Sequence, residues 1–323
     1  MNGSNLPLVS VGIPAYNHEK YIQKTIRSII AQTYQNIELI VIDDGSEDST
    51  WQKIQELKQE CEKRFVRIDF STQENCGVCK TSNKIKAKAQ GEFIYSIASD
   101  DLAKPQAIEK QLDFLLKNKD YALAVGDNEI IDSEGKRAYW DNERNLIYDE
   151  NKAKHKTFGS SLRAGKYPIS NPEQFGTYEN LLRGNHIPNG SLIRKSVFDE
   201  IGDFTPEAPL EDYWSMLQIS KRAKLKYIDE VLFSYRWHGK NTAAQTERME
   251  KMTEKTLEYE KNKYIGNNRR LNDILRYRNC KILFRIPPVL TIYKKKKGKN
   301  RTIYADILSR SFVLYKYSVS EAQ

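Results

Sequence analysis

The sequence predicts an α/β protein in which a doubly wound, mostly parallel sheet is followed by a helical, basic C-terminal region. Two near-continuous apolar runs, at residues 8–13 and 37–42, have the composition of strands buried on both faces. Between them, four isoleucines of residues 21–32 fall on one face of a helix. A strand, a helix and a strand at this spacing form a βαβ unit with parallel strands.

The alternation of strands and helices continues to about residue 125. Ser46 and Ser49 supply helix-capping side chains, and Pro105 has the place of a first helical residue. The predicted elements are a helix at 50–63, a strand at 66–70, a helix at 78–89, a strand at 92–97, a helix at 105–118 and a strand at 121–125. Roughly the first 130 residues therefore form the regular half of the predicted domain.

The second half of the predicted domain, residues 131–244, is less regular. Residues 135–180 are polar with few periodic signals, which predicts a long loop or insertion. Order returns as a strand at 190–193, helices at 195–201 and 211–223, and short strands around Tyr227 and Phe233. The domain boundary is expected at residue 244.

The remaining residues, 245–323, differ in charge from the domain before them. Residues 1–240 contain 33 Lys and Arg against 35 Asp and Glu, whereas residues 241–323 contain 19 against 8. Residues 246–285 read as a charged helix, and 303–317 as an amphipathic stretch. A basic region attracts phosphate-rich partners such as nucleic acid, anionic lipid headgroups or anionic substrates.

Two pairs of carboxylates follow predicted strands. Asp43 and Asp44 end the second strand, and Asp100 and Asp101 follow the fourth. Ligands of open parallel sheets bind at the carboxyl ends of the strands. Clustered anions repel one another unless a positive group joins them, so the two pairs together indicate a site.

The two pairs suit different tasks. Hard divalent ions such as Mg²⁺ or Mn²⁺ take carboxylate oxygens and leave positions open for phosphate, which makes Asp100 and Asp101 the better metal candidates. A carboxylate at Asp43 or Asp44 could accept hydrogen bonds from a ring N–H of a base, with Tyr16 stacked on its face. Alone, the Asp-Asp-Gly-Ser run would read as a turn and a helix cap.

At this point six motifs resemble the family 2 glycosyltransferases with the GT-A fold, in the family's order and spacing over residues 8–244. The motifs are IPAYN at 13–17, ELIVIDDGSEDST at 38–50, NCG at 75–77, GEFIYSIASDD at 91–101, LEDYW at 210–214 and SYRWHGKNTA from residue 234. The resemblance implies an inverting transferase that takes a sugar from a nucleotide diphosphate, with UDP-sugar as the default donor and Mn²⁺ or Mg²⁺ as the cofactor.

The resemblance also implies site residues. Asp101 would be the direct metal ligand, with His238 near the metal or diphosphate, and Asp212 would be the general base. Residues implied to bind nucleotide or substrate are Pro14, Ala15, Tyr16, Asn17, Asp43, Asp44, Gly77, Asn83, Asp100, Glu211, Lys240 and Asn241. Two positions depart from the family pattern: Ser99 stands where many members have a third Asp, and Ser82 precedes Asn83 where Arg is common.

The chemistry of an inverting transfer agrees with the assignment of Asp212. A single in-line displacement needs one base for the acceptor hydroxyl and a charge sink for the leaving diphosphate on the opposite side. Glu211 and Asp212 open a predicted helix, whose N–H groups and dipole are expected to keep the base ionised at neutral pH.

Three alternative functions are less well supported. A sugar-nucleotide nucleotidyltransferase would carry a Gly-rich, Arg-containing loop after the first strand, where this chain has Pro14–Asn17. A nucleic-acid-binding protein would place its basic charge on the α/β domain, which is slightly acidic. A non-catalytic nucleotide-sugar-binding relative would not need both Asp101 and Asp212.

The acceptor is expected to be a saccharide or a lipid-linked saccharide of cell-surface polysaccharide synthesis. Residues 281–301 contain eight basic and no acidic residues, interleaved with apolar ones, which predicts contact with an anionic membrane surface. The polar start of the chain does not read as a signal peptide, so we expect a cytoplasmic protein, peripheral on the inner face of the cell membrane. The oligomeric state is open.

Overall fold

Strand β1 (Val9–Ala15) pairs in parallel with β2 (Ile37–Asp43) on one side and with β4 (Phe93–Ser96) on the other. The computed structural model describes residues 6–239 and 241–277 and the strand backbone at 280–286, 290–297, 300–307 and 310–318; from residue 277 onward no side chain is described. Because β1, β2 and β4 are buried and rich in β-branched and aromatic residues, they form the centre of the predicted parallel sheet, with β3 at its edge.

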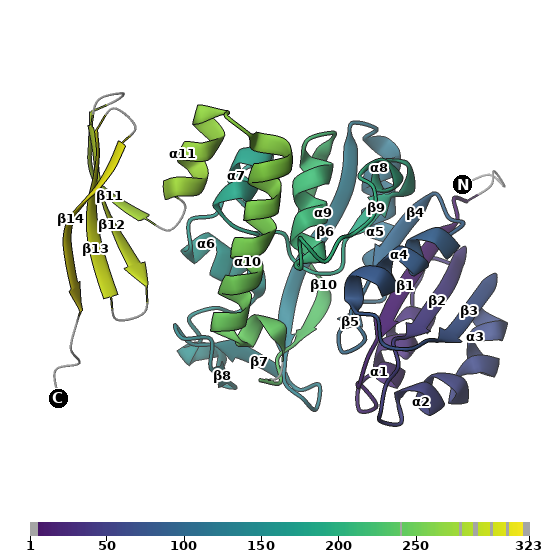
Figure 1. Ribbon diagram of the computed structural model, residues 1–323. Helices are drawn as coiled ribbons and strands as arrows, with labels where there is room; N and C mark the ends of the chain where they lie inside the picture. The colour runs from purple at the N-terminus through teal and green to yellow at the C-terminus, as the bar shows by residue number, and fades with distance from the viewer. Residues whose placement is uncertain are drawn as a thin grey trace. The chain divides into compact units, whose positions relative to one another are not determined.

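The sheet has the strand order β3-β2-β1-β4-β9-β6-β10-β5, with β7 paired to β6 and β8 to β7 (Figure 1). The additional strands are β3 (Arg67–Thr72), β5 (Leu102–Ala103), β6 (Tyr121–Ile131), β7 (Arg137–Trp140), β8 (Leu146–Ile147), β9 (Leu192–Arg194) and β10 (Lys224–Arg236). Strand β9 is antiparallel to both neighbours, whereas β10 is parallel to β6. Chain order reverses between β1 and β4, which is the point where α/β sheets bind ligands.

Helices flank this sheet (Figure 1). They are α1 (Ile22–Ile30), α2 (Thr50–Glu56), α3 (Lys58–Arg64), α4 (Val78–Lys88), α5 (Ala107–Lys117), α6 (Phe158–Ala164), α7 (Tyr178–Arg183), α8 (Lys195–Glu200) and α9 (Glu211–Ser220). The predicted isoleucine face of α1 is confirmed, because Ile22, Ile26 and Ile29 are fully buried.

A buried carboxylate fixes the relative positions of the first strands. Glu38 in β2 is fully buried and accepts hydrogen bonds from Ser10 Oγ and from the Gln90 and Gly91 backbone, while Arg67 pairs with it at 2.6 Å. These partners offset the desolvation of the charge. They also join β1, β2, β3 and the entry to β4, so the ends of these strands are held in register.

Two predictions for the second half of the domain are wrong. Residues 135–180 are not one long loop, because they contain β7, β8 and α6, elements too short to leave a periodic signal in the sequence. The two short strands predicted near Tyr227 and Phe233 form a single strand, β10, whose pairing with β6 shifts register at Ile228 and Val231. Such bulges interrupt the period-2 pattern on which the prediction relied.

The prediction of a helical C-terminal region is correct only as far as residue 277. Helical structure continues through α10 (Thr246–Glu260), a π-helical turn (Lys261–Ile265) and α11 (Arg269–Tyr277). A four-stranded antiparallel sheet follows, of β11 (Cys280–Ile286), β12 (Leu290–Lys297), β13 (Asn300–Ile307) and β14 (Arg310–Ser318). The β-branched and aromatic residues of this segment favour strands, and the prediction gave more weight to its many Lys and Arg, which favour helices.

The chain divides into two compact units. The first contains residues Met1–Leu181 and His186–Tyr259, and the second contains Leu182–Asn185 and Glu260–Gln323. The first unit holds the ten-stranded sheet, and the second holds the antiparallel sheet of β11 to β14. Within the described part of the chain, none of the helices has the length and apolar character needed to cross a bilayer.

Candidate active site

The carboxylates at the end of β2 are held by the protein itself. Asp44 accepts hydrogen bonds from the Gln73 side chain at 2.7 Å and from the backbone N–H groups of Cys76 at 3.0 Å and Gly77 at 2.9 Å. Burial raises the pKa of Asp44, but the hydrogen bonds outweigh it, and the net pKa is lowered. Asp44 is therefore a fixed anion beside the switch point of the sheet.

Neighbouring residues of the predicted nucleotide pocket shape the loop around Asp44. Asp43 binds the Ser46 hydroxyl at 2.5 Å and the Thr72 hydroxyl at 3.0 Å, so it closes the turn after β2. Asn17, in the left-handed region at φ 51°, accepts a hydrogen bond from Glu47 N. The Pro14–Asn17 segment thus contains the last two residues of β1 and the two that follow it, and Ala15 O accepts a hydrogen bond from Asp44 N.

Three further residues predicted for the nucleotide site differ in their exposure and contacts. Tyr16 is 44% exposed, which leaves it open to a ligand. Gly77 has φ 85°, and a side chain there would meet no atom within 4 Å, so its backbone borders open space. Asn83, in contrast, pairs through both of its amide atoms with the backbone of Phe204, at 2.9 and 2.8 Å. Its direct contact with a donor stays a prediction.

A group of metal-binding side chains lies where β1 and β4 end. One ligand atom from each of His18, Asp100 and His238 lies within 4.8 Å of the others. His238 Nε2 is 3.0 Å from the Asp100 carboxylate, and His18 Nδ1 is 2.7 Å from Ser99 Oγ. One carboxylate and two imidazoles suit a divalent transition ion such as Mn²⁺. The three residues therefore fit a divalent metal.

Sequence reasoning did not select His18. It stands directly after the Pro14–Asn17 segment, so its place past the end of the first strand was the available signal. Burial is the largest influence on His18 and lowers its pKa, which favours the neutral imidazole that binds metals. Ser99, the departure from the family pattern, contributes the hydroxyl that orients this ring.

Asp101 has a different environment from Asp100. It is 1% exposed, and its Oδ1 accepts a hydrogen bond from the Arg236 backbone N–H at 2.8 Å. Burial, followed by the neighbouring Asp100 charge, raises its pKa well above the usual range. For Asp100, the hydrogen bond from His238 and the charges of His18 and His238 outweigh burial and lower the pKa. The geometry favours Asp100 as a metal ligand, whereas the direct role of Asp101 stays a prediction.

The end of β10 and the turn after it position His238, the third member of this group. The Arg236 guanidinium lies 4.9 Å from the centre of the Tyr21 ring, which stacks on His238 at 5.2 Å. Asn241 accepts a hydrogen bond from His238 N and donates one to Arg236 O, both at 2.8 Å, so it fixes the turn that presents the imidazole. Lys240, also predicted in the site, lies outside the described residues.

Glu211 and Asp212 form the first turn of α9, as predicted. Asp212 reaches solvent, and its Oδ1 accepts a hydrogen bond from Tyr213 N at 2.6 Å. The expectation that the helix terminus lowers their proton affinity is wrong. Burial and the Asp212 charge raise the pKa of Glu211 to about 8, and surrounding protein raises the pKa of Asp212 as well.

We expect Glu211 to weaken the fold as pH rises. Between its ordinary pKa of 4.5 and about 8, the folded state holds a proton that the unfolded state has lost, so stability falls with increasing pH. Glu211→Gln should flatten the melting temperature measured from pH 5 to pH 8.5. Glu207→Gln, an exposed carboxylate on the preceding loop, is the control. Equal slopes in wild type and Glu211→Gln would show that Glu211 is already ionised.

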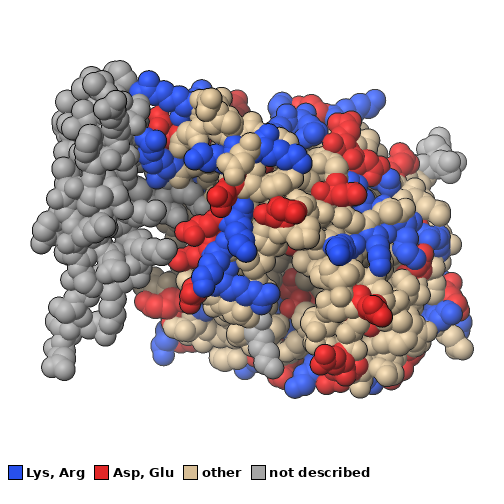
Figure 2. All heavy atoms as spheres, in the orientation of Figure 1, with Lys and Arg blue, Asp and Glu red and all other residues tan. Residues whose placement is uncertain are grey.

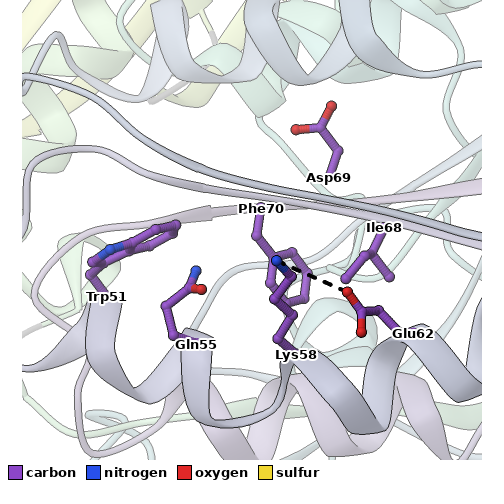
Figure 3. Close-up of a pocket in the computed structure, with 7 residues that line it drawn as sticks. All are labelled: Trp51, Gln55, Lys58, Glu62, Ile68, Asp69 and Phe70. Atoms are coloured by element: carbon purple, nitrogen blue, oxygen red, sulfur yellow. Dashed lines mark ion pairs between the residues drawn. The ribbon is translucent and has the colours of Figure 1, made fainter.

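The surface of the protein shows a hollow in one view and a pocket elsewhere. The face drawn in Figure 2 is hollowed near its centre, and acidic side chains are visible inside the hollow. A separate pocket of about 450 Å³ lies between α2, α3 and β3, where Lys58 and Glu62 are 4.0 Å apart (Figure 3). None of the predicted site residues lines that pocket, so it is not the centre of the chemistry.

Solved structures with the same arrangement of strands and helices define the class of fold. A Pyrobaculum calidifontis mannosyltransferase, PcManGT, in complex with GDP-Man and Mn²⁺ superposes with a TM-score of 0.61 at 12% identity, over 85% of this chain and 71% of that one. S. aureus TarS 1-349 in complex with UDP-GlcNAc gives 0.58 at 16% identity, over 84% and 72%. The fold is GT-A, as the resemblance implied.

Sequence comparison then identifies the family. Residues 10–202 match the family described as glycosyl transferase family 2. An uncharacterized glycosyltransferase of Haemophilus influenzae is 34% identical over 270 residues, which cover 81% of this chain and 76% of that protein. Chondroitin synthase of Escherichia coli is 28% identical over 238 residues, 74% of this chain but 30% of the synthase. The chain belongs to glycosyl transferase family 2 and is a glycosyltransferase.

Proposed function

We propose that this chain is an inverting, metal-dependent glycosyltransferase that takes its sugar from a nucleotide diphosphate, with UDP-sugar as the default donor. The observation that carries the proposal is the group of His18, Asp100 and His238 at the switch point of the sheet. The proposal assigns the metal to these three residues rather than to Asp101. A divalent ion bound there would neutralise the leaving diphosphate.

The chain's own residues would perform the remaining tasks. The Asp44 carboxylate and the exposed Tyr16 ring would receive the base, since an ionised carboxylate can accept the N–H of uracil or thymine. Asp212, in the first turn of α9 and with a raised pKa, would take the proton from the acceptor hydroxyl. Inversion follows, because the hydroxyl and the leaving group lie on opposite sides of the anomeric carbon.

A saccharide or lipid-linked saccharide of cell-surface polysaccharide synthesis is the proposed acceptor. Support comes from relatives named for polymer synthesis, such as chondroitin synthase and the hyaluronan synthase of Pasteurella multocida, which is 26% identical over 271 residues. Membership of family 2 disfavours the nucleotidyltransferase alternative. Membrane association stays a prediction, because the basic side chains of residues 281–301 lie outside the described ones. The cytoplasmic location also stays a prediction.

Thermal unfolding with a panel of UDP, TDP, GDP, CDP and CMP, each with Mn²⁺ or with chelator, tests the donor site. A ligand at 100 times its Kd adds about 2.7 kcal/mol, which raises the melting temperature by several degrees. We expect such a shift with one nucleotide, with UDP first, and only when Mn²⁺ is present. A folded protein that shifts with none of them would contradict the proposed donor site and favour a binding-only relative with another ligand.

A further inference from the structure

The segment from Tyr235 to His238 presents alternate side chains to two different surroundings, as an extended strand does. Arg236 and His238 both pack on Tyr21, beside the proposed metal ligands. Tyr235 and Trp237 instead contact each other, with ring centres 6.0 Å apart. The second pair therefore lies on the opposite side of the segment from Tyr21 and the proposed metal ligands.

Tyr235 and Trp237 belong to an aromatic cluster that also contains Trp140 of β7 and Phe158 of α6. Trp140 lies 5.1 Å from Trp237 and 6.4 Å from Tyr235, and Phe158 lies 6.2 Å from Tyr235, all edge to face. Trp140 is fully buried, whereas Tyr235 and Trp237 are half-buried. Both residues therefore keep some solvent-accessible surface, and an aromatic ring can receive the C–H face of a sugar.

Arg144 extends over this cluster from the turn between β7 and β8. Its guanidinium lies 5.2 Å from the centre of the Trp140 ring. Arg144 has φ 63°, a left-handed conformation that is unusual for a residue with a side chain. The Asp141 side chain stabilises the turn, because it accepts hydrogen bonds from Glu143 N, Asn145 N and Asn145 Nδ2 at 2.8 to 2.9 Å. The turn therefore holds the arginine in a defined place.

The charges around Tyr235 connect this surface to the rest of the site. Burial is the main cause that raises the pKa of its hydroxyl, and the charges of Asp101, Asp100 and Asp212 raise it further, while Arg144 opposes them. Tyr235 thus lies within electrostatic reach of both the proposed metal group and the proposed base. Arg144 is exposed, and no carboxylate pairs with it among the described residues.

We propose that Tyr235, Trp237 and Arg144 form an acceptor subsite for a saccharide that carries an anionic group, either a carboxylate or a phosphate. The sugar ring stacks on the exposed parts of Tyr235 and Trp237, and the Arg144 guanidinium pairs with the anion. The charges of Asp100, Asp101 and Asp212 act on Tyr235, so an anionic sugar at this ring is repelled unless a cation receives it. This inference rests on the proposed function and specifies the acceptor.

Calorimetric titration of the full chain with UDP and Mn²⁺ bound tests the subsite. The probes are three matched methyl glycosides: a hexuronic acid, a hexose 6-phosphate and the neutral hexose. We expect at least one anionic glycoside to bind about tenfold more tightly than the neutral one, and the preferred anion distinguishes carboxylate from phosphate. Arg144→Gln should remove that preference and leave the affinity for the neutral glycoside within about twofold. Trp237→Ala should weaken all three.

Arg222→Gln, which changes an exposed arginine after the other end of α9, is the matched control and should keep the preference. Equal affinity for neutral and anionic glycosides, no binding of the anionic ones, or a preference that survives in Arg144→Gln would overturn the inference. So would loss of UDP affinity in Arg144→Gln, since the arginine would then serve the donor. The Mn²⁺-dependent UDP shift, measured on the same samples, separates failure of this subsite from failure of the donor site.

Discussion

Asp212→Asn is expected to lower the rate of sugar transfer by roughly 10² to 10⁴, the usual contribution of a general base. Asparagine keeps the oxygen that accepts the Tyr213 N–H, so the first turn of α9 should stay intact. It cannot take a proton from the acceptor hydroxyl. Donor binding, measured by the Mn²⁺-dependent nucleotide shift, should therefore remain near wild type while product formation is lost.

Asp203→Asn provides the control, because Asp203 is an exposed carboxylate on the loop that precedes α9. It should transfer sugar at the wild-type rate. The pH profile adds a second readout: wild-type kcat/KM should fall as pH drops through the raised pKa of Asp212, since the protonated carboxyl is no base. If Asp212→Asn kept near wild-type transfer, the base would be another group, and Glu211→Gln would be the next variant to measure.

Asp100→Asn is expected to abolish the Mn²⁺-dependent part of nucleotide binding. In the wild type that part is the melting shift at saturating nucleotide and Mn²⁺, about 2.7 kcal/mol at 100 times Kd. The variant should lose the shift but keep its melting temperature without ligand, because Asp100 borders the two imidazoles and not the hydrophobic core. His18→Ala and His238→Ala should each raise the Mn²⁺ concentration needed for half of the shift.

Asp101→Ala is the informative comparison. Asp101 is buried and accepts the Arg236 backbone N–H, so its removal leaves a buried donor unpaired and should lower the melting temperature without ligand. Asp101→Asn keeps a side-chain oxygen for that N–H, so it should stay folded. We expect its melting temperature still to rise when nucleotide and Mn²⁺ are added. If Asp101→Asn lost the metal shift and Asp100→Asn kept it, Asp101 would be the direct ligand that the sequence resemblance implied.

The sequence predicted the first half of the domain well because its signals are local. Buried strands β1 and β2 are near-continuous apolar runs, and the isoleucines of α1 share one face. Signals that depend on distant pairing were lost: β10 contains bulges that hide its length, and β7 and β8 are too short to show a period. Residues 280–318 have the composition of strands, but their basic residues resembled a helix face.

The site was predicted by strand ends and motifs, and its internal arrangement was not. Sequence placed Asp100 and His238 in one site, and the structure brings them to 3.0 Å. It did not find His18, which joins them from another loop, and it assigned the direct metal contact to Asp101, whereas Asp100 is the carboxylate that lies with the two imidazoles. Nor could it find that burial outweighs a helix terminus at Glu211, because burial depends on the whole fold.

The alternating segment at the end of β10 restricts how this protein can change over evolution. Tyr235 and Trp237 face one surrounding, and Arg236 and His238 face the other. Insertion or deletion of a single residue within β10 downstream of its bulges would exchange the two sets, and both surroundings would be lost at once. A change of length in a neighbouring turn such as 141–145 would instead alter the setting of Arg144, in the proposed acceptor subsite, and leave the residues proposed to hold the metal in place.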